Sequence, residues 1–254
     1  FRYSYDFPGG ASEGRSASLG AIATIRNGDD YRNIVEGVDG RWQQGAHTMT
    51  AQWLHSTTQD PGEGDSFDGG AYNFEYNYDS RNWAAYAGRN QFDDGFRADL
   101  GFIGQVGYTG NFAGVSRTWY GDKEDAWTQA RIRLRGSRSE TTEGVLLNRF
   151  SGISGSVNGP WLSYVEVGYD RFDRTWNGVV FEERLNRIYA NFTPVSGLKL
   201  GLFLRHGDKI DFANTRLGTV TTIQPELTAN IGRSLSIQID HNYERLSRDG
   251  GDVY

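Results

Sequence analysis

Apolar and polar side chains alternate one by one along most of this chain. Between residues 72 and 79, three tyrosines and a phenylalanine alternate with two asparagines, a glutamate and an aspartate. A β-strand places successive side chains on opposite faces, so this pattern predicts a strand with one aromatic face and one polar face. Residues 198–205 and 235–244 repeat the alternation with leucine and isoleucine as the apolar members.

The same alternation predicts about 14 strands. They are expected at residues 1–7, 17–26, 33–44, 47–58, 70–79, 82–92, 103–120, 126–137, 143–157, 161–173, 180–193, 197–206, 220–232 and 234–246. Many are longer than the roughly 5–6 residues of a globular strand. Both a soluble β-sandwich and a membrane β-barrel would use such strands, but their length favours the barrel.

The predicted connections fall into two alternating classes. Tight turns are expected at residues 44–46, 79–81, 158–160, 194–197 and 232–233, and longer polar links at 27–32, 59–69, 93–100, 137–142, 174–179 and 207–219. Outer-membrane barrels have short periplasmic turns and longer extracellular loops. The sequence therefore predicts an all-β, antiparallel, up-and-down transmembrane β-barrel, formed by residues 1–254 as one domain.

The alternation of tight turns and long links also gives each predicted strand a direction across the membrane. If the tight turns are periplasmic, both ends of the chain lie on the extracellular side, whereas bacterial barrels begin and end in the periplasm. We therefore expect the chain to be an internal part of a longer protein whose barrel has 16 or more strands. The long link expected at residues 8–16 does not fit this direction.

Composition agrees with a barrel and excludes other classes. The chain has 254 residues, 34 glycines, 5 prolines, no cysteine and 14% aromatic residues. Its mean hydropathy of −0.61 is expected of a barrel with a polar interior, which needs apolar residues only at every second position. No stretch is apolar enough for a membrane-spanning helix. The net charge of −6 argues against nucleic acid as a partner.

Residues 95–108, Gly-Phe-Arg-Ala-Asp-Leu-Gly-Phe-Ile-Gly-Gln-Val-Gly-Tyr, resemble a family of unknown function in Gram-negative outer-membrane proteins. In that family a C-terminal barrel follows a carbohydrate-binding-like domain. The resemblance implies a barrel fold and no catalytic residues. Physically, the glycines and the aspartate of this segment indicate either a loop that folds into the lumen and constricts a pore or an ordinary loop that closes a hairpin.

Charged residues expected on the polar face are the candidate pore-lining groups. The basic candidates alternate on one strand, and the acidic ones are spread over several strands: Arg131, Arg133, Arg135, Glu75, Glu166, Asp170, Glu226, Asp240 and Glu244. Opposed basic and acidic walls can select solutes. The alternative is that these residues solvate a wet interior and pair across strands.

Tryptophans near predicted strand ends suggest membrane girdles. They are Trp42, Trp53, Trp83, Trp119, Trp127, Trp161 and Trp176. Aromatic rings also stack on sugars, which is the alternative role for them.

Catalytic and metal sites receive little support. Four histidines are scattered, and only His206, near Asp208, could serve a hydrolase. Acidic loops at residues 60–68 and 93–99 could bind calcium, but they lack a recognised ligand spacing. We expect neither enzyme activity, nor a metal, nor a cofactor.

The sequence thus predicts a bacterial outer-membrane barrel that forms a pore for small polar solutes, saccharides among them. Its expected partners are the lipid bilayer, lipopolysaccharide and an envelope protein. The alternative is a plugged barrel that acts as a surface binding protein or anchors a periplasmic sugar-binding domain.

Overall fold

The computed structural model describes residues 1–7, 14–62, 65–101, 103–232, 234–248 and 251–254. Its strands are β1 (Arg2–Phe7), β2 (Arg15–Gly28), β3 (Tyr31–Gln44), β4 (His47–Asp60), β5 (Asp65–Asp79), β6 (Trp83–Phe92), β7 (Tyr108–Tyr120), β8 (Gln129–Thr141), β9 (Leu146–Gly159), β10 (Ser163–Trp176), β11 (Val179–Val195), β12 (Leu198–Asp211), β13 (Arg216–Ile231), β14 (Leu235–Asp240), β15 (Tyr243–Arg248) and β16 (Gly251–Asp252). Within the described ranges, no helix is long and apolar enough to cross a membrane.

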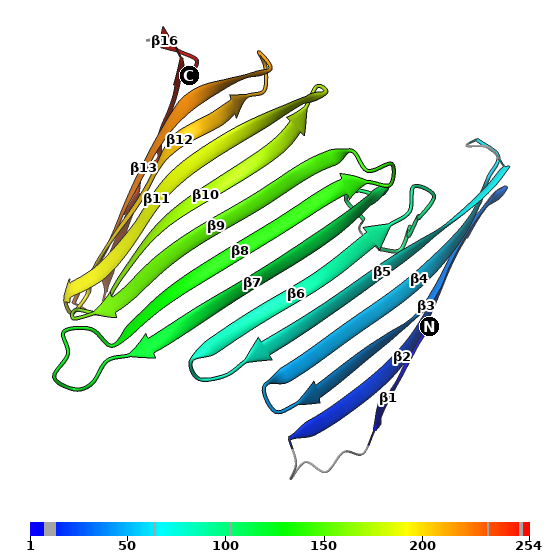
Figure 1. Ribbon diagram of the computed structural model, residues 1–254, viewed down its shortest axis with the longest axis horizontal. Helices are drawn as coiled ribbons and strands as arrows, with labels where there is room; N and C mark the ends of the chain where they lie inside the picture. The colour runs from blue at the N-terminus through cyan, green and yellow to red at the C-terminus, as the bar shows by residue number, and fades with distance from the viewer. Residues whose placement is uncertain (8–13, 63–64, 102, 233, 249–250) are drawn as a thin grey trace. The chain divides into compact units, whose positions relative to one another are not determined.

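Neighbours in sequence are neighbours in the sheet. The strand order runs from β1 to β13 without a crossover, β15 and β16 follow, and β14 also pairs with β13 (Figure 1). Paired strands run antiparallel. In β12 and β13, for example, Leu202 lies opposite Pro225. The predicted all-β, up-and-down, antiparallel topology is therefore confirmed.

Pro225 explains why one predicted strand is observed as two. Residues 234–246 were expected to be continuous, but β14 ends at Asp240 and β15 begins at Tyr243. Both strands keep one register against β13, with Glu226 opposite Asp240 and Ile223 opposite Tyr243. Pro225 has no N–H to give to the ladder, so it can only accept: the His241 N–H donates to the Pro225 carbonyl oxygen at 3.2 Å.

Contacts divide the chain into two compact units, which are described separately. Unit 1 comprises Phe1–Gly114 and Ser137–Leu147, and unit 2 comprises Val115–Gly136 and Asn148–Tyr254. Each unit has an apolar face, whose large side chains are exposed, and a polar face that carries most of the charged groups.

In unit 1 the apolar face holds the aromatic residues of the opening pattern. Trp53 of β4 lies directly opposite Val38 of β3 and Tyr72 of β5. Phe74 is 44% exposed and Trp53 51%, although both lie in the middle of the sheet. Such exposure in mid-sheet is typical of a surface whose apolar side is covered by lipid.

In unit 2 the same division runs along β10. Val165, Val167 and Tyr169 are exposed on one face, whereas Asp170 on the other face is buried. The alternation along β12 agrees with it, since Leu204 lies opposite Ile188 and Ile223 while Arg205 contacts groups on the other face. The predicted assignment of faces is confirmed for these strands.

Most of the predicted long links are wrong. Residues 27–32 shrink to a turn at 29–30, residues 174–179 to one at 177–178, and residues 207–219 to one at 212–215. The strands continue through these polar stretches. A strand of 14 residues, such as β3, is about 46 Å long at about 3.3 Å per residue. A strand that crosses a bilayer has only about 9–11 residues, so these strands extend beyond the apolar zone. Beyond the apolar zone both faces can be polar, so the alternation disappears while the strand goes on.

Two longer connections remain among the described residues, at 93–107 and 121–128. The first was predicted with shorter bounds, 93–100. In the second, residues 121–125 separated two predicted strands, and residues 126–128 were expected to begin the second of them. Of the expected link at residues 8–16 and the turn at 232–233, residues 8–13 and Arg233 lie outside the described residues.

Candidate functional site

The connection between β6 and β7, residues 93–107, lies against the polar face of unit 1, and we call it the infolded segment (Phe102 lies outside the described residues). Its Phe96 is 3% exposed and forms a buried cluster with Val35 of β3 and Ala71 of β5. Leu54 of β4 packs against the same cluster, as does Ala98 of the segment. Of the two alternatives for this segment, the inward fold is thus the observed one.

Hydrogen bonds fix the backbone of the infolded segment to buried polar side chains. Asn33 Nδ2 donates to the Arg97 carbonyl oxygen at 3.0 Å, and the Asp99 N–H donates to Asn33 Oδ1 at 3.3 Å. The Arg97 N–H donates to Ser56 Oγ at 3.0 Å. Asn33 and Ser56 are 2% and 0% exposed. Buried amide and hydroxyl groups need such partners, so the segment and the strands satisfy each other.

Two glycines allow the segment to approach β5 this closely. A Cβ on Gly69 would lie 2.3 Å from the Phe96 nitrogen, and a Cβ on Gly95 would lie 2.3 Å from the Asp68 carbonyl oxygen. Any side chain at either position would collide with backbone atoms. The two glycines therefore set the distance between the segment and the strand.

Asp99 of the infolded segment is surrounded by an ion cluster. Tyr31 donates a hydrogen bond to Asp99, Arg97 Nε donates to it at 3.0 Å, and Arg26 lies 3.2 Å away. Burial acts to raise the pKa of Asp99, but the bonds from Tyr31 and Arg97 and the nearby positive charges outweigh it. The pKa of the Asp99 carboxyl consequently lies below its usual value.

Arg97 is the exposed member of the cluster that belongs to the infolded segment, and Arg26 of β2 is exposed as well. Its side chain is 35% exposed, against 7% for Asp99, and its guanidinium also lies 3.5 Å from Asp60. The guanidinium of Arg97 lies 5.5 Å from the centre of the Tyr31 ring. The segment thus presents a positioned positive charge from the polar face of unit 1.

The three predicted arginines of β8 lie on the polar face of unit 2. Arg131 Nε donates to Thr118 Oγ1 at 3.0 Å, and Arg135 lies 3.4 Å from Asp170. Arg133 acts electrostatically on Glu166. The structure therefore brings Arg133 and Arg135 together with two of the predicted acidic residues.

Arg187 of β11, which the sequence reading did not single out, joins those two acids. Its Nε donates to Asp170 at 2.8 Å and its Nη1 contacts Glu166. Its guanidinium covers Gly168, the residue directly opposite in β10, where a Cβ would lie 2.9 Å from the guanidinium carbon. The glycine thus makes room for the guanidinium to reach both carboxylates.

The remaining acidic candidates make other contacts. Glu244 of β15 accepts hydrogen bonds from Arg205 at 2.8 Å and Lys209 at 2.6 Å. Glu226 and Asp240 are exposed and directly opposite each other. In unit 1, Glu75 accepts a hydrogen bond from Asn77 Nδ2 at 2.9 Å.

The tryptophans fall into four groups. Trp42, Trp83 and Trp119 are exposed at or near strand ends on the apolar face, and Trp127 and Trp161 lie in connections. Trp53 lies in mid-strand where the apolar face changes from Met49 and Ala51 to polar residues, and it stacks on His55. Trp176 ends β10, and its Nε1 donates to the Phe212 carbonyl oxygen at 3.1 Å. An anchoring role stays a prediction.

Metal and histidine chemistry gain no support from the geometry. Among the described residues, no group of three or more histidine, aspartate or glutamate side chains could hold a metal ion. Glu63 of the expected acidic loop lies outside them. His206 Nδ1 is 3.0 Å from Thr221 Oγ1.

The sequence contains a signal for the infolded segment. Val35, Leu54 and Ala71 are apolar at positions where the alternation demands polar-face residues. They lie on three neighbouring strands, so they form one apolar spot on the polar face. Such a spot needs an apolar cover, which Phe96 provides.

Comparisons with known proteins place the fold. No family model matches the chain, and no curated protein sequence matches it. It is similar to the crystal structures of three Pseudomonas aeruginosa proteins. OpdQ gives a TM-score of 0.51 at 10% identity, over 94% of this chain and 89% of that one.

OccK10 (OpdN) gives a TM-score of 0.50 at 13% identity, over 99% of this chain and 94% of that one. OccK5 (OpdH) gives 0.50 at 10% identity, over 99% and 92%. These proteins are outer-membrane barrels of the Occ (OprD) family. Membership of the family of unknown function suggested by residues 95–108 gains no support. At such low identity the likeness concerns the fold alone: this chain has the antiparallel β-barrel fold.

Proposed function

We propose that this protein lies in the bacterial outer membrane and forms a pore for small polar solutes. The exposed apolar face would contact lipid, and the polar face would line the aqueous path. The solved structures with this fold are outer-membrane channels, which supports the proposal.

The observation that carries the proposal is the infolded segment on the polar face. Barrels of about 16–18 strands leave an aqueous channel unless something narrows it. A segment held there by Phe96, Asn33 and Ser56 would narrow the path at a fixed level. Arg97 would then present its guanidinium to passing solutes.

Charges on the polar face would bias which solutes pass. The nine candidates from the sequence would line the path together with Arg187 and Arg97. Paired guanidinium and carboxylate groups offer hydrogen bonds to hydroxyl-rich and zwitterionic molecules as well as to ions. We therefore include saccharides among the solutes.

The alternative is a plugged barrel that binds a ligand or an envelope partner, or that anchors a sugar-binding domain as in the family suggested by residues 95–108. The tight packing of the infolded segment fits a plug as well as a constriction. A plug predicts no current, so the two functions differ in one measurable property.

Reconstitution into planar bilayers tests the proposal. Purified protein should give discrete current steps in potassium chloride, and the reversal potential in a salt gradient should report ion preference. Heat-modifiable migration on gels would verify that the barrel is folded. Folded, inserted protein that carries no current would contradict the pore and favour the plugged barrel.

A further inference from the structure

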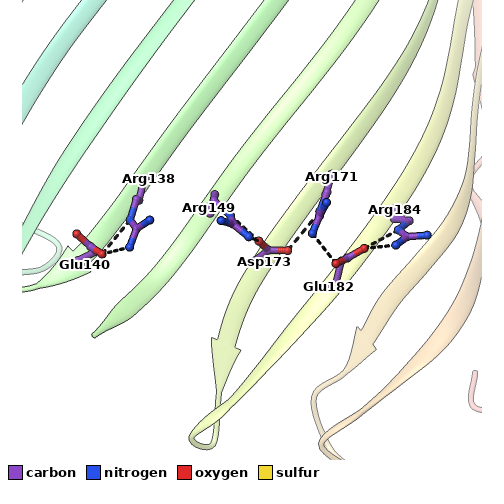
Figure 2. Close-up of polar contacts among 7 residues, drawn as sticks. All are labelled: Arg138, Glu140, Arg149, Arg171, Asp173, Glu182 and Arg184. Atoms are coloured by element: carbon purple, nitrogen blue, oxygen red, sulfur yellow. Dashed lines mark hydrogen bonds and ion pairs between the residues drawn. The ribbon is translucent and has the colours of Figure 1, made fainter. Parts of the chain in front are cut away.

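A belt of charged side chains lies on the apolar face of unit 2, which would not line a pore. It comprises Arg149 of β9, Arg171 and Asp173 of β10, and Glu182 and Arg184 of β11, and we call it the outer charged belt (Figure 2). On β10, Arg171 and Asp173 continue the face of Val165, Val167 and Tyr169, which is the apolar face. The belt therefore points toward the surroundings of the barrel.

Every member of the belt is bonded to its neighbour. Arg149 Nε donates to Asp173 at 2.6 Å, and Arg171 Nη2 donates to Glu182 at 2.6 Å. Arg184 Nε donates to the other oxygen of Glu182, also at 2.6 Å. Arg171 Nε lies 3.6 Å from Asp173, which completes the chain of contacts drawn in Figure 2.

The guanidinium groups are the most accessible part of this chain. The side chains of Arg149, Arg171 and Arg184 are 51%, 41% and 61% exposed, whereas Asp173 is 5% exposed and Glu182 35%. Asp173 thus lies beneath the arginines, whereas Glu182 is nearly as exposed as Arg171 and holds Arg171 and Arg184 between its two oxygens. What the surroundings meet is positive charge with unused N–H donors, since a guanidinium carries five.

The register places like charges side by side. Arg171 lies directly opposite Arg184, and Asp173 lies directly opposite Glu182. Directly opposed like charges destabilise a sheet, so stability alone would favour the alternating arrangement. Two adjacent arginines are instead the arrangement that grips an anion with several oxygens, since guanidinium groups bind phosphate bidentately.

The order of charges along the strands also has a direction. On β10 the apolar face runs from Val167 and Tyr169 to Arg171 and then Asp173, so an arginine comes first after the apolar zone. On β8 the same face runs from Leu134 through Gly136 to Arg138 and then Glu140. Arg138 Nε donates to Glu140 at 2.8 Å, so this end of β8, which belongs to unit 1, has the same order of arginine and carboxylate along the strand (Figure 2).

We propose that the outer charged belt binds the phosphate groups of lipopolysaccharide in the outer leaflet. This inference rests on the proposed outer-membrane location. A ligand whose acyl chains lie along Val165, Val167 and Tyr169 has its headgroup at the level of Arg171 and Arg184. We take the turn at residues 177–178 to be extracellular, the side expected from the sequence for residues 174–179, and lipopolysaccharide carries its phosphates on that side. The belt contributes the arginines, and the carboxylates of Asp173 and Glu182 hold them in place.

Binding to defined lipids in detergent micelles tests this site. The probes are lipopolysaccharide, the same lipopolysaccharide with both lipid A phosphates removed, and inorganic phosphate. Binding would be followed by tryptophan fluorescence, since the chain has 7 tryptophans, and by the lipid-induced shift in the thermal midpoint. Wild-type protein should bind the phosphorylated lipid at least about tenfold more tightly than the dephosphorylated one.

The double variant Arg171→Gln/Arg184→Gln should lose that preference, and Arg171→Lys/Arg184→Lys should keep part of it. Arg81→Gln/Lys123→Gln removes two positive charges from exposed turns and should behave as wild type. Equal binding of both lipids by wild type, or an unchanged preference in the Gln variant, would overturn the site. So would displacement of the lipid by inorganic phosphate at equal concentration.

Bilayer currents separate this inference from the proposed function. Protein that conducts but ignores the lipid phosphates would refute the belt as a lipid site and leave the pore intact. If the Gln variant does not fold, Glu182→Gln provides the second test. It frees Arg171 and Arg184 from their shared brace and should weaken the preference without removing positive charge.

Discussion

Asn33 of β3 donates a hydrogen bond from its side-chain amide to the carbonyl oxygen of Arg97 at 3.0 Å. The same amide group also donates to Thr58 Oγ1 at 2.9 Å and accepts from the Asp99 N–H. One buried side chain therefore joins two strands to the infolded segment. If the segment sets the width of a pore, Asn33 determines how rigidly it does so.

Replacing this anchor should loosen the segment. Asn33→Ala leaves the Arg97 carbonyl and the Asp99 N–H without a partner, which costs about 1–3 kcal/mol of unfolding free energy. We expect a lower urea midpoint in lipid vesicles and larger, noisier single-channel currents. The matched control is Asn73→Ala, which removes an exposed amide from the same polar face. Equal currents and midpoints in both variants would show that Asn33 does not hold the segment.

A side chain at Gly95 should displace the segment by steric collision. In Gly95→Ala the new Cβ would meet the Asp68 carbonyl oxygen at 2.3 Å. Such overpacking costs about 1–3 kcal/mol. Gly155→Ala is the control, because a Cβ there would meet no atom within 4 Å. Thermal unfolding of both variants measures the difference, and a Gly95→Ala midpoint equal to that of Gly155→Ala would refute the close approach.

Removing Arg187 should make the polar face of unit 2 more negative. Arg187→Gln leaves Glu166 and Asp170 without their shared guanidinium, and about 1.5–3 kcal/mol is lost for each such charged hydrogen bond. Reversal potentials in a salt gradient should shift toward cation preference. The double variant Arg187→Gln/Glu166→Gln has the same net charge as the wild type and should restore the wild-type value. No shift in the single variant would place Arg187 outside the ion path.

Charge reversal at Arg133 tests the predicted arginine row in the same way. Arg133 lies on the polar face and acts on Glu166. Arg133→Glu should favour cations, because it changes the local charge by two. Ser163→Glu, on the other face of β10, which β9 separates from β8, controls for the added acid. Unchanged reversal potentials in Arg133→Glu would remove it from the conducting path.

Acid should release the infolded segment. The pKa of Asp99 is lowered in the folded protein. Its ion cluster therefore stabilises the segment at any pH above the ordinary aspartate pKa of about 3.9. That stabilisation is lost as pH falls below this value through the folded-state pKa. Currents should be constant from about pH 7 to 5 and change below about pH 4. Asp99→Asn should already show the acid behaviour at pH 7, and a pH transition that persists in it would have another cause.

The alternation of side chains was sufficient to predict the strands and their faces. Tyr72 and Phe74 lie on the apolar face, and Asn73 and Glu75 lie on the polar one. It failed beyond the apolar zone, where charged residues such as Asp208 and Asp211 continue β12 past its predicted end at residue 206. Pattern alone cannot separate such a strand end from a polar loop, because water and lipid headgroups accept both.

The site was only partly predictable for a similar reason. Arg133, Arg135, Glu166 and Asp170 follow from strand alternation, since each lies on a regular strand. Arg187 also lies on the polar face of a regular strand, opposite Gly168, so the same alternation could have predicted it. The contacts of Asn33 and Ser56 with residues far along the chain depend on how an irregular segment folds back. No local pattern contains that information.

Thiol labelling at position 97 tests the central claim most directly, because the chain has no cysteine of its own. A single-channel recording of Arg97→Cys would be made before and after a charged, water-soluble thiol reagent, with Val167→Cys on the apolar face as the control. We predict a stepwise fall in current for Arg97→Cys and none for Val167→Cys. Mass spectrometry would verify labelling at position 97. A fully labelled Arg97→Cys channel with unchanged current would contradict the claim that the infolded segment narrows a pore.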